Sequence, residues 1–393
     1  MYFYQNFYPE LKAVYSHTIY STINHLPKEW DELAASTIFL SKEYLAILEK
    51  SAPINMSCHF IGIFDKETLV GIAVSQFIDL NQLESFGERD QCIKSSVRNI
   101  VFKNFCSHIL LIGNNTLTGQ NAFVISENAN PTEVLKTLQK AVIALKAIFK
   151  AKGKKVHMCG LKDFCEDKLI LLEIPEFKPY LRFSTQPNMI FTVRDHWKTE
   201  EDYVAALSKK YRDQYKRARK KATGLVKKQL SLKEIIAQEN VIYDLYHHVA
   251  KSAPFNTFFL PRNHFTIFKE QLQENFLFYG YFENDRLIGF NTLIKNGTDL
   301  DTYFLGYDDS LQREKMLYLN MLYDMIGYAI KEQFKTVIFA RTALEIKSSV
   351  VATPLNMYGL MSHNNTFINS SLYFFYRYLE PETVWKERHP FQE

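Results

Sequence analysis

One order of predicted elements occurs twice in this chain, and this repetition constrains the fold more than any other feature. The first copy has a helix, a hairpin, a strand, a long helix and a strand, over 39–50, 58–65 with 68–78, 108–114, 131–151 and 155–161. The second copy repeats that order over 264–274, 276–283 with 286–296, 299–308, 315–334 and 336–340. The two hairpins align by eye, FIGIFDKETLVGIAVSQF against YGYFENDRLIGFNTLIK. The pattern predicts two copies of one α+β unit, each with a mixed sheet.

Length and composition suit a folded chain of two domains. At 393 residues, 47% of them hydrophobic, the chain exceeds what one ordinary core usually carries. No run approaches the roughly 18–20 apolar residues that cross a bilayer, and the start, MYFYQNFYPELKAVY, does not have the form of a secretory signal. An odd, scattered set of cysteines argues against a disulfide framework: Cys58, Cys92, Cys106, Cys159 and Cys165. These features predict a cytoplasmic protein.

Positive charge is concentrated between the two copies. The window from Lys209 to Lys228 holds ten Lys and Arg residues against one acid, so it carries a formal charge of +9 and the rest of the chain −5. Apolar residues recur at helical spacing over 195–224, which predicts a helix with one apolar and one basic side that Gly224 ends. The basic side is open to three interpretations: a solvated face, a surface for RNA phosphates, or a contact with anionic lipid headgroups. The residues expected to bind a polyanion are Lys216, Arg217, Lys220 and Lys221.

Two motifs carry a resemblance to a known family. The stretch LSKKYRDQYKRARKKATGL, over 207–225, precedes the second copy, and FARTALEIKSSVVA, over 339–352, follows its last strand. In their order and spacing the chain resembles the FemAB-like branch of the GNAT acyltransferase superfamily over about residues 35–390. It is also similar to GNAT-type acetyltransferase domains encoded beside polysaccharide-synthesis genes. The resemblance implies an α+β fold of two tandem GNAT-like units, each a mixed twisted sheet flanked by helices.

The resemblance also divides the chain. It implies a first unit over 1–195, a basic helical connector over 196–235 and a second unit over 236–393. The first unit lacks the Arg and Lys arrangement of the second motif, because KVHMCGL leads into KDFCEDK. We therefore expect the first unit to be a degenerate copy on the acceptor side, and the second to bind the donor and carry the chemistry.

The activity implied is transfer of an acyl or aminoacyl group from an activated carrier to an amine or hydroxyl of a small-molecule or cell-envelope precursor. Acyl-CoA, an acyl-carrier protein and aminoacyl-tRNA remain open as carriers, and no tightly bound cofactor is expected. Carrier phosphate is usually met at a helix N-terminus. The corresponding stretch here, 306–320, has no glycine in QREKMLYLN, so the side chains of Arg313 and Lys315 are expected to contact the phosphate.

The implied partners are a small-molecule or lipid-linked substrate and, through the basic helix, tRNA or an anionic membrane surface at its inner face, but not DNA. A non-catalytic GNAT-fold protein that recognises an envelope precursor or polyanion is the alternative.

The candidate catalytic residues lie on the strand after the second hairpin. Acyl transfer needs a group that exchanges protons with the reactants, and Asp301 and Tyr303 are the expected catalytic residues. The residues expected to contact the acceptor are Asn256, Asn291 and Tyr307. Each of these five is also compatible with an ordinary role in a strand or connecting loop.

The stretch FARTALEIKSSV places three charges behind a buried strand. Thr342 and Glu345 have the spacing of a capping box, which predicts a helix start. Arg341 and Lys347 are the expected anion contacts for the donor. No metal site is expected, because His157, Cys159 and Cys165 lack a fourth ligand in reach by sequence.

Overall fold

A computed structural model describes residues 15–82, 105, 107–119, 121–252, 256–379 and 385–391. The first fourteen residues, Cys92 and Cys106, which enter the predictions above, lie outside the described residues.

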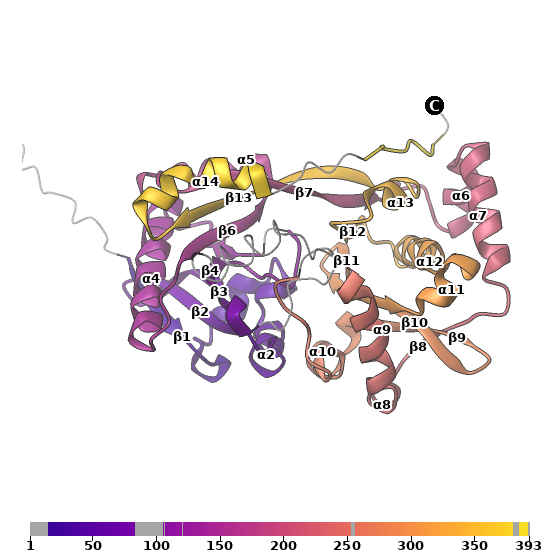
Figure 1. Ribbon diagram of the computed structural model, residues 1–393, viewed down its shortest axis with the longest axis horizontal. Coiled ribbons are helices and arrows are strands. Elements are labelled where there is room, and N and C mark those ends of the chain that lie inside the picture. The colour runs from indigo at the N-terminus through magenta and orange to yellow at the C-terminus, as the bar shows by residue number, and fades with distance from the viewer. Residues whose placement is uncertain are drawn as a thin grey trace, which may run out of the picture.

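In the described part of the chain, thirteen strands form one sheet (Figure 1). The strands are β1 (Ser16–Tyr20), β2 (Met56–Asp65), β3 (Thr68–Asp79), β4 (His108–Ile112), β5 (Phe123–Ile125), β6 (Met158–Phe164), β7 (Leu181–Thr192), β8 (Val226–Gln229), β9 (Phe276–Glu283), β10 (Arg286–Asn296), β11 (Asp299–Tyr307), β12 (Thr336–Ala340) and β13 (Thr353–His363). Their order across the sheet is β1-β2-β3-β4-β6-β13-β7-β12-β11-β10-β9-β8, with β5 paired to β3.

This order confirms the predicted repeat. Each half has four antiparallel strands followed by one parallel strand, β6 beside β4 in the first half and β12 beside β11 in the second. The last strand of each half crosses over: β7 pairs with β12, and β13 pairs with β6. The two exchanged strands also pair with each other and run along the top of the molecule in Figure 1. The halves are therefore interlocked at the middle of the sheet.

The helices cover the two faces of the sheet. They are α1 (Trp30–Ala34), α2 (Lys42–Lys50), α4 (Pro131–Ala151), α5 (Glu166–Leu169), α6 (Glu200–Ala206), α7 (Lys209–Lys221), α8 (Leu232–Ala237), α9 (Glu239–Ser252), α10 (His264–Leu272), α11 (Asp309–Lys315), α12 (Leu317–Lys331), α13 (Leu344–Ser348) and α14 (Thr366–Leu379). The long helix α4 begins as its sequence predicts, with Pro131 in its first turn and the Asn130 side chain accepting from two backbone N–H groups.

Three large clusters of buried apolar side chains hold these layers together. One packs α12 and α7 on the second half, and one packs α4 on the first. The third belongs to both halves, because it joins α2 to α10, with the rings of Tyr44 and Phe268 5.8 Å apart and edge to face. The junction between the halves is thus a core, on which a site can be held rigidly.

Two local predictions are wrong. The helix predicted over 195–224 is broken into α6 and α7, because Leu207 is extended and buries its side chain. The capping box at Thr342 does not form: the chain passes through left-handed conformations at Ala340, Thr342 and Ala343, so α13 starts after Ala343 with no side-chain cap. Glu345 instead accepts from the backbone N–H of Lys386 and from the Arg388 side chain.

Candidate active site at the junction of the two halves

The parallel strands β11 and β12 separate early. They pair over three residues only, the last being Asp301 opposite Ile338. Beyond that point β11 continues to Tyr307 with β10 on one side, while β12 ends at the left-handed Ala340. Among the described residues no strand pairs with the other edge of β11 after Asp301. Beyond Asp301 this edge of β11 therefore lacks a strand partner among the described residues.

Asp301 lies where the strands separate. Its side chain faces the shared core, since its partner on β10, Ile294, belongs to that cluster. Burial first, and then the neighbouring Asp299, raises the pKa of the Asp301 carboxyl to about 8. Asn296 is its hydrogen-bonding neighbour, and Oδ2 has no hydrogen-bond partner among the described residues. At neutral pH this carboxyl is therefore mostly protonated and can give or take a proton.

Tyr303 lies two residues further along the same face. Its hydroxyl is 3.0 Å from Nε2 of His264 at the start of α10, and burial raises its pKa well above the ordinary value. The other ring nitrogen of His264 is 3.1 Å from the backbone oxygen of Ser51, at the end of α2. This chain of contacts connects the two halves behind β11.

The expected acceptor contacts are elsewhere. Asn291 stands opposite Tyr279, whose ring packs in the α12 cluster, so Asn291 lies on the other face of the sheet from Tyr303. Tyr307 packs on that α12 cluster as well. Asn256 donates to the carbonyl of Ala250 at 2.8 Å. The structure thus brings Asp301 and Tyr303 together and places the three expected acceptor contacts apart from them.

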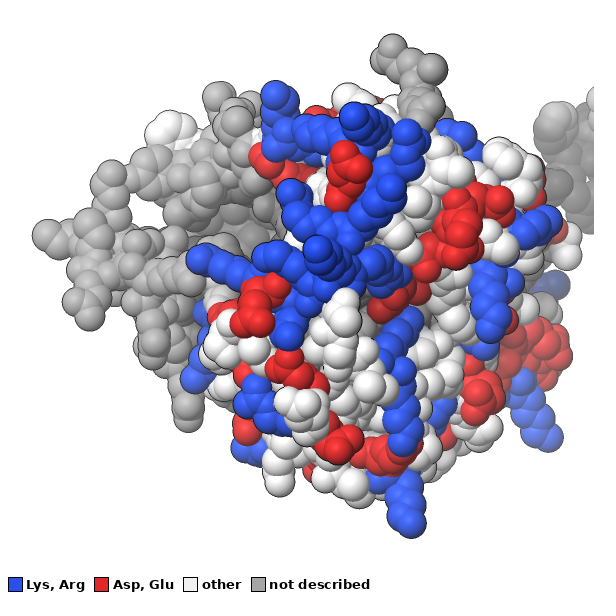
Figure 2. All heavy atoms as spheres, turned by 90° about the vertical axis from the view of Figure 1, so that its right-hand side faces the viewer, with Lys and Arg blue, Asp and Glu red and all other residues white. Residues whose placement is uncertain are grey.

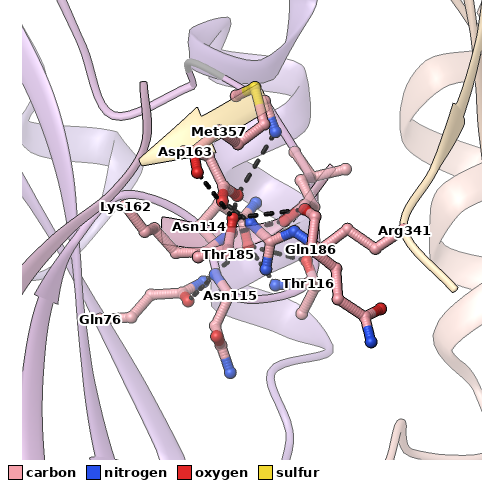
Figure 3. Close-up of polar contacts among 12 residues, drawn as sticks. Gln76, Asn114, Asn115, Thr116, Lys162, Asp163, Thr185, Gln186, Arg341 and Met357 are labelled. Atoms are coloured by element: carbon pink, nitrogen blue, oxygen red, sulfur yellow. Dashed lines mark hydrogen bonds and ion pairs between the residues drawn. The ribbon is translucent and has the colours of Figure 1, made fainter. Parts of the chain in front are cut away.

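A buried group of charges joins the ends of β6 and β12 (Figure 3). Asp163 is fully buried and forms ion pairs with Lys162, its neighbour in sequence, and with Arg341 of the other half. The left-handed backbone at Asp163, with φ of 66°, breaks the alternation of the strand, so both side chains reach the same place. Burial, and then Arg341, lowers the pKa of Lys162.

The loop after β4 is built on this group. Lys162 Nζ donates to the carbonyls of Asn114 and Leu117 at 3.1 and 2.7 Å. The Asn114 side chain in turn donates to the Tyr44 hydroxyl at 2.9 Å and accepts from Gln76 at 3.0 Å. A continuous set of polar contacts therefore runs from the end of β12 to the neighbourhood of Tyr303.

The same loop holds a segment of the second half. Asn115 donates to the Thr257 hydroxyl at 2.8 Å, and Asn55 donates to the Thr257 carbonyl at 2.8 Å. Phe258 then packs edge to face near Phe304, beside Tyr303. The part of the connector from Asn256 onward thus lies across the junction of the halves.

Both expected donor contacts behind β12 are engaged within the protein. Arg341 pairs with Asp163. Lys347 is 4% exposed and donates to the carbonyls of Phe339 and Arg341, each at 2.6 Å, and of Ala340 at 3.3 Å. Burial lowers the pKa of Lys347 to about 7. Lys347 thus satisfies the carbonyls that the left-handed turn leaves without strand partners.

Within the stretch expected to meet carrier phosphate, the start of α12 is covered by α7. Asn320, in the first turn of α12, donates to the Ala218 carbonyl of α7 at 2.9 Å, so α7 lies against the start of α12. Lys315 pairs with Glu283 at 2.6 Å, whereas Arg313 is exposed.

The basic helix has two sides of different character. On its inner side Arg219 pairs with Asp324 at 2.7 Å and with Glu200 at 2.5 Å, and these carboxylates hold its pKa above the ordinary value against burial. The four residues expected to bind a polyanion are all exposed on α7: Lys216, Arg217, Lys220 and Lys221. Figure 2 views this end of the molecule and shows a band of Lys and Arg bordered by Asp and Glu.

Sequence reasoning missed three groups at the junction. Lys162 and Asp163 directly follow the strand predicted over 155–161, which is a signal of the kind used for Arg341, but Asp163 matched no motif. His264 gave no signal, because a single histidine at a predicted helix start is common. Its role depends on Ser51 and Tyr303, which are far from it in sequence.

Two further findings concern the described residues alone. No helix among them is long and apolar enough to cross a membrane. They also contain no cluster of three or more His, Cys, Asp or Glu side chains suited to a metal ion.

Comparison with known proteins places the architecture. No protein-family model and no curated protein sequence matches the chain. Among solved structures, FemX matches with a TM-score of 0.52 and 11% identity, over 89% of this chain and 98% of its own. The tandem GNAT protein from the clavulanic acid biosynthesis pathway matches with a TM-score of 0.49 and 8% identity, over 89% of this chain and 99% of its own. L-PGS from Bacillus licheniformis matches with a TM-score of 0.46 and 11% identity, over 86% of this chain and 96% of its own.

At identities of 8–11%, these matches are evidence about the fold alone. The chain is an α+β protein of two tandem GNAT-like units, and the match to FemX over nearly the whole of both chains makes this fold FemAB-like. The predicted fold class is therefore confirmed, and the resemblance is confirmed at the level of the fold.

Proposed function

We propose that this protein transfers an acyl or aminoacyl group from an activated carrier to an amine or hydroxyl at the gap between β11 and β12. The observation that carries the proposal is the unpaired edge of β11 beside the protonated carboxyl of Asp301. An extended donor with amide groups can add to such an edge as a further strand does. Asp301 then stands where a proton must be exchanged as the acyl group moves.

The reaction needs two proton movements that balance. The acceptor loses one proton as its nitrogen or oxygen forms the new bond to the acyl carbon, and the carrier gains one as its thiol or hydroxyl leaves. A carboxyl with a pKa near neutrality serves both movements, because it is neither strongly acidic nor strongly basic at working pH.

The carrier is proposed to approach over α7. Its exposed lysines and arginines suit a phosphate-bearing carrier, and the band follows a helix about 20 Å long. Carboxylates on both sides of the band favour a narrow polyanion such as RNA over the plane of an anionic membrane, which would also meet the acids. An acyl-CoA or an acyl-carrier protein remains a possible donor, with no cofactor bound between turnovers.

The acceptor side and the domain boundaries stay proposals. The first unit, 1–195, is proposed to shape the acceptor side, the connector 196–235 to carry the polyanion surface, and the unit 236–393 to hold the donor. The exchange of β7 and β13 means that each unit completes the sheet of the other.

The proposal is tested by incubating the protein with an acyl-CoA mixture, acylated carrier protein and aminoacyl-tRNA, each with a panel of amines and alcohols. Release of free thiol or deacylated tRNA that requires the acceptor supports transfer, and Asp301→Asn should lower that rate by at least tenfold. Binding of donors without turnover by any pair would support the non-catalytic alternative instead.

The carrier surface has its own test. Changing Lys216, Arg217, Lys220 and Lys221 to Glu should abolish retention on heparin and on immobilised tRNA, because each phosphate contact is electrostatic. The control variant changes four exposed lysines of the first half to Glu: Lys50, Lys66, Lys150 and Lys168. It makes the same change in net charge and should leave retention intact. Equal loss in both variants would mean that net charge alone governs retention. A vesicle of anionic lipid that binds when tRNA does not would place α7 at a membrane.

A further inference from the structure

The hydrogen bonds of His264 determine what the Tyr303 hydroxyl can do. The His264 ring is 1% exposed and sits between two partners. Nδ1 is 3.1 Å from both the backbone oxygen and the hydroxyl of Ser51, and Nε2 is 3.0 Å from the Tyr303 hydroxyl. Which ring nitrogen carries the proton follows from what each partner can offer.

Ser51 fixes the proton on Nδ1. Its backbone oxygen can only accept a hydrogen bond, and its hydroxyl already donates to the carbonyl of Ile47 at 2.9 Å. Nδ1 therefore has to be the donor. Burial lowers the pKa of His264 to about 4, so the ring is neutral at physiological pH and Nε2 carries no proton.

A bare Nε2 accepts the only proton that Tyr303 has. The Thr116 hydroxyl, which also hydrogen-bonds Tyr303, donates its own proton to Asn114 Oδ1 at 2.7 Å and so offers Tyr303 only a lone pair. The imidazole Nε2 is the stronger base of the two acceptors, and therefore it takes the Tyr303 proton. Tyr303 Oη is thus left with lone pairs and no hydrogen to give. The nearest group on the same face of β11 with an exchangeable proton is Asp301, about 7 Å along the strand.

We propose that His264 is a positioning residue that takes up the Tyr303 proton in a hydrogen bond, so that Tyr303 acts only as a hydrogen-bond acceptor and Asp301 alone exchanges protons with the reactants. This inference rests on the proposed function and divides the work between its two candidate residues. In the transfer step, the Asp301 carboxyl gives its proton to the departing thiol or hydroxyl of the carrier. The resulting carboxylate then takes the proton that the acceptor loses, which restores the starting state.

The arrangement also ties the reacting strand to the first half. Ser51 ends α2 of the first half, His264 begins α10 of the second, and Tyr303 is in β11. The position of Tyr303 is therefore set by a contact between the halves.

The test is nitrogen NMR of the full chain labelled with ¹⁵N-histidine, which reads the protonation of each ring nitrogen without any substrate. We expect His264 to show a proton on Nδ1, a bare Nε2, and no titration between pH 8 and pH 5.5. The His264 signals are assigned by their loss in His264→Gln.

Tyr303→Phe should shift the Nε2 resonance of His264, because the hydrogen bond to it is gone, and should leave the Nδ1 proton in place. A proton on Nε2 in the wild type would overturn the inference, since Tyr303 would then be free to donate. An unmoved Nε2 resonance in Tyr303→Phe would overturn it as well. Neither reading depends on turnover, so this inference can fail while acyl transfer is observed, and the reverse also holds.

Discussion

Replacing Asp163 by Asn should destabilise the protein more than any other single loss of charge at the junction. Asp163 is fully buried, and it is the counter-charge for Lys162 and for Arg341, whose side chains are only 12% and 25% exposed. Its Oδ2 also accepts from the backbone N–H of Gly119 at 3.3 Å. The amide of Asn can accept only weakly from these donors and leaves two cations uncompensated.

The magnitude follows from that geometry. Breaking a buried ion pair by removing one partner costs about 3–5 kcal/mol, because a desolvated charge is left behind. Arg341 is partly in contact with solvent, which screens its charge and places the expected loss near the lower limit, about 3 kcal/mol. Glu166→Gln is the matched control, because its pair with Arg182 is exposed, at 75% and 47%, and should change stability by less than about 1 kcal/mol.

The measurement is the free energy of unfolding in urea, for wild type, Asp163→Asn, Arg341→Met and the double variant. The two single changes should couple by about 1–3 kcal/mol, since each removes the partner of the other. If Asp163→Asn lies within 1 kcal/mol of the wild type, or the two changes simply add, the ion group does not hold the halves together and the reasoning is refuted.

Three further predictions concern two buried histidines, the buried Lys347 and the Glu345 carboxylate. Burial lowers the pKa of His264 and His59 to about 4, so between pH 6.5 and pH 4 the unfolded chain takes up protons on these rings and the folded chain does not. The free energy of unfolding should therefore fall by about 3 kcal/mol per ring as the pH drops from 6.5 to 4. In urea titrations, His264→Gln should make that fall smaller. Lys347→Met leaves three carbonyls without their donor and should cost about 2–4 kcal/mol, whereas the same change at exposed Lys331 should cost less than about 0.5 kcal/mol. Glu345→Ala releases the segment 385–391, so trypsin should cut it faster while the melting temperature stays nearly constant; an unchanged rate of cleavage would mean that other contacts hold the segment.

The repeated elements could be predicted from the sequence because their signals are local. The hairpins alternate or are continuously apolar, the long helices have helical spacing, and the turns carry Asn, Asp and Gly. The strands β7 and β13 were not predicted. Each contains a proline and few consecutive apolar residues, Pro187 in LRFSTQPNMIFT and Pro354 in TPLNMYGLMSH. Their strand character depends on pairing with the other half, which a single sequence does not display.

Part of the candidate site could also be predicted from the sequence, and part could not. Asp301 and Tyr303 could be singled out because they alternate along one predicted strand. Their chemistry could not, because it depends on the burial of the Asp301 carboxyl and on the His264 ring, both of which follow from tertiary packing. The capping box at Thr342 failed for a related reason. After β12 the backbone takes a turn whose carbonyls accept hydrogen bonds from Lys347, instead of the conformation that the local sequence favours.

The charges of FARTALEIKSSV now have partners on three different elements. Arg341 meets Asp163 of the first half, Glu345 meets Arg388 of the C-terminal segment, and Lys347 meets the carbonyls of its own turn. The Arg341 and Glu345 contacts join distant parts of the chain, whereas the Lys347 contacts hold the turn that follows β12. The first half thus supplies the counter-charge for Arg341, just after the end of β12, whereas in the first half β4 ends at its last described pair with β6. Because the carboxylate that pairs with Arg341 belongs to the first half, we expect the first half to be required for any chemistry proposed at Asp301.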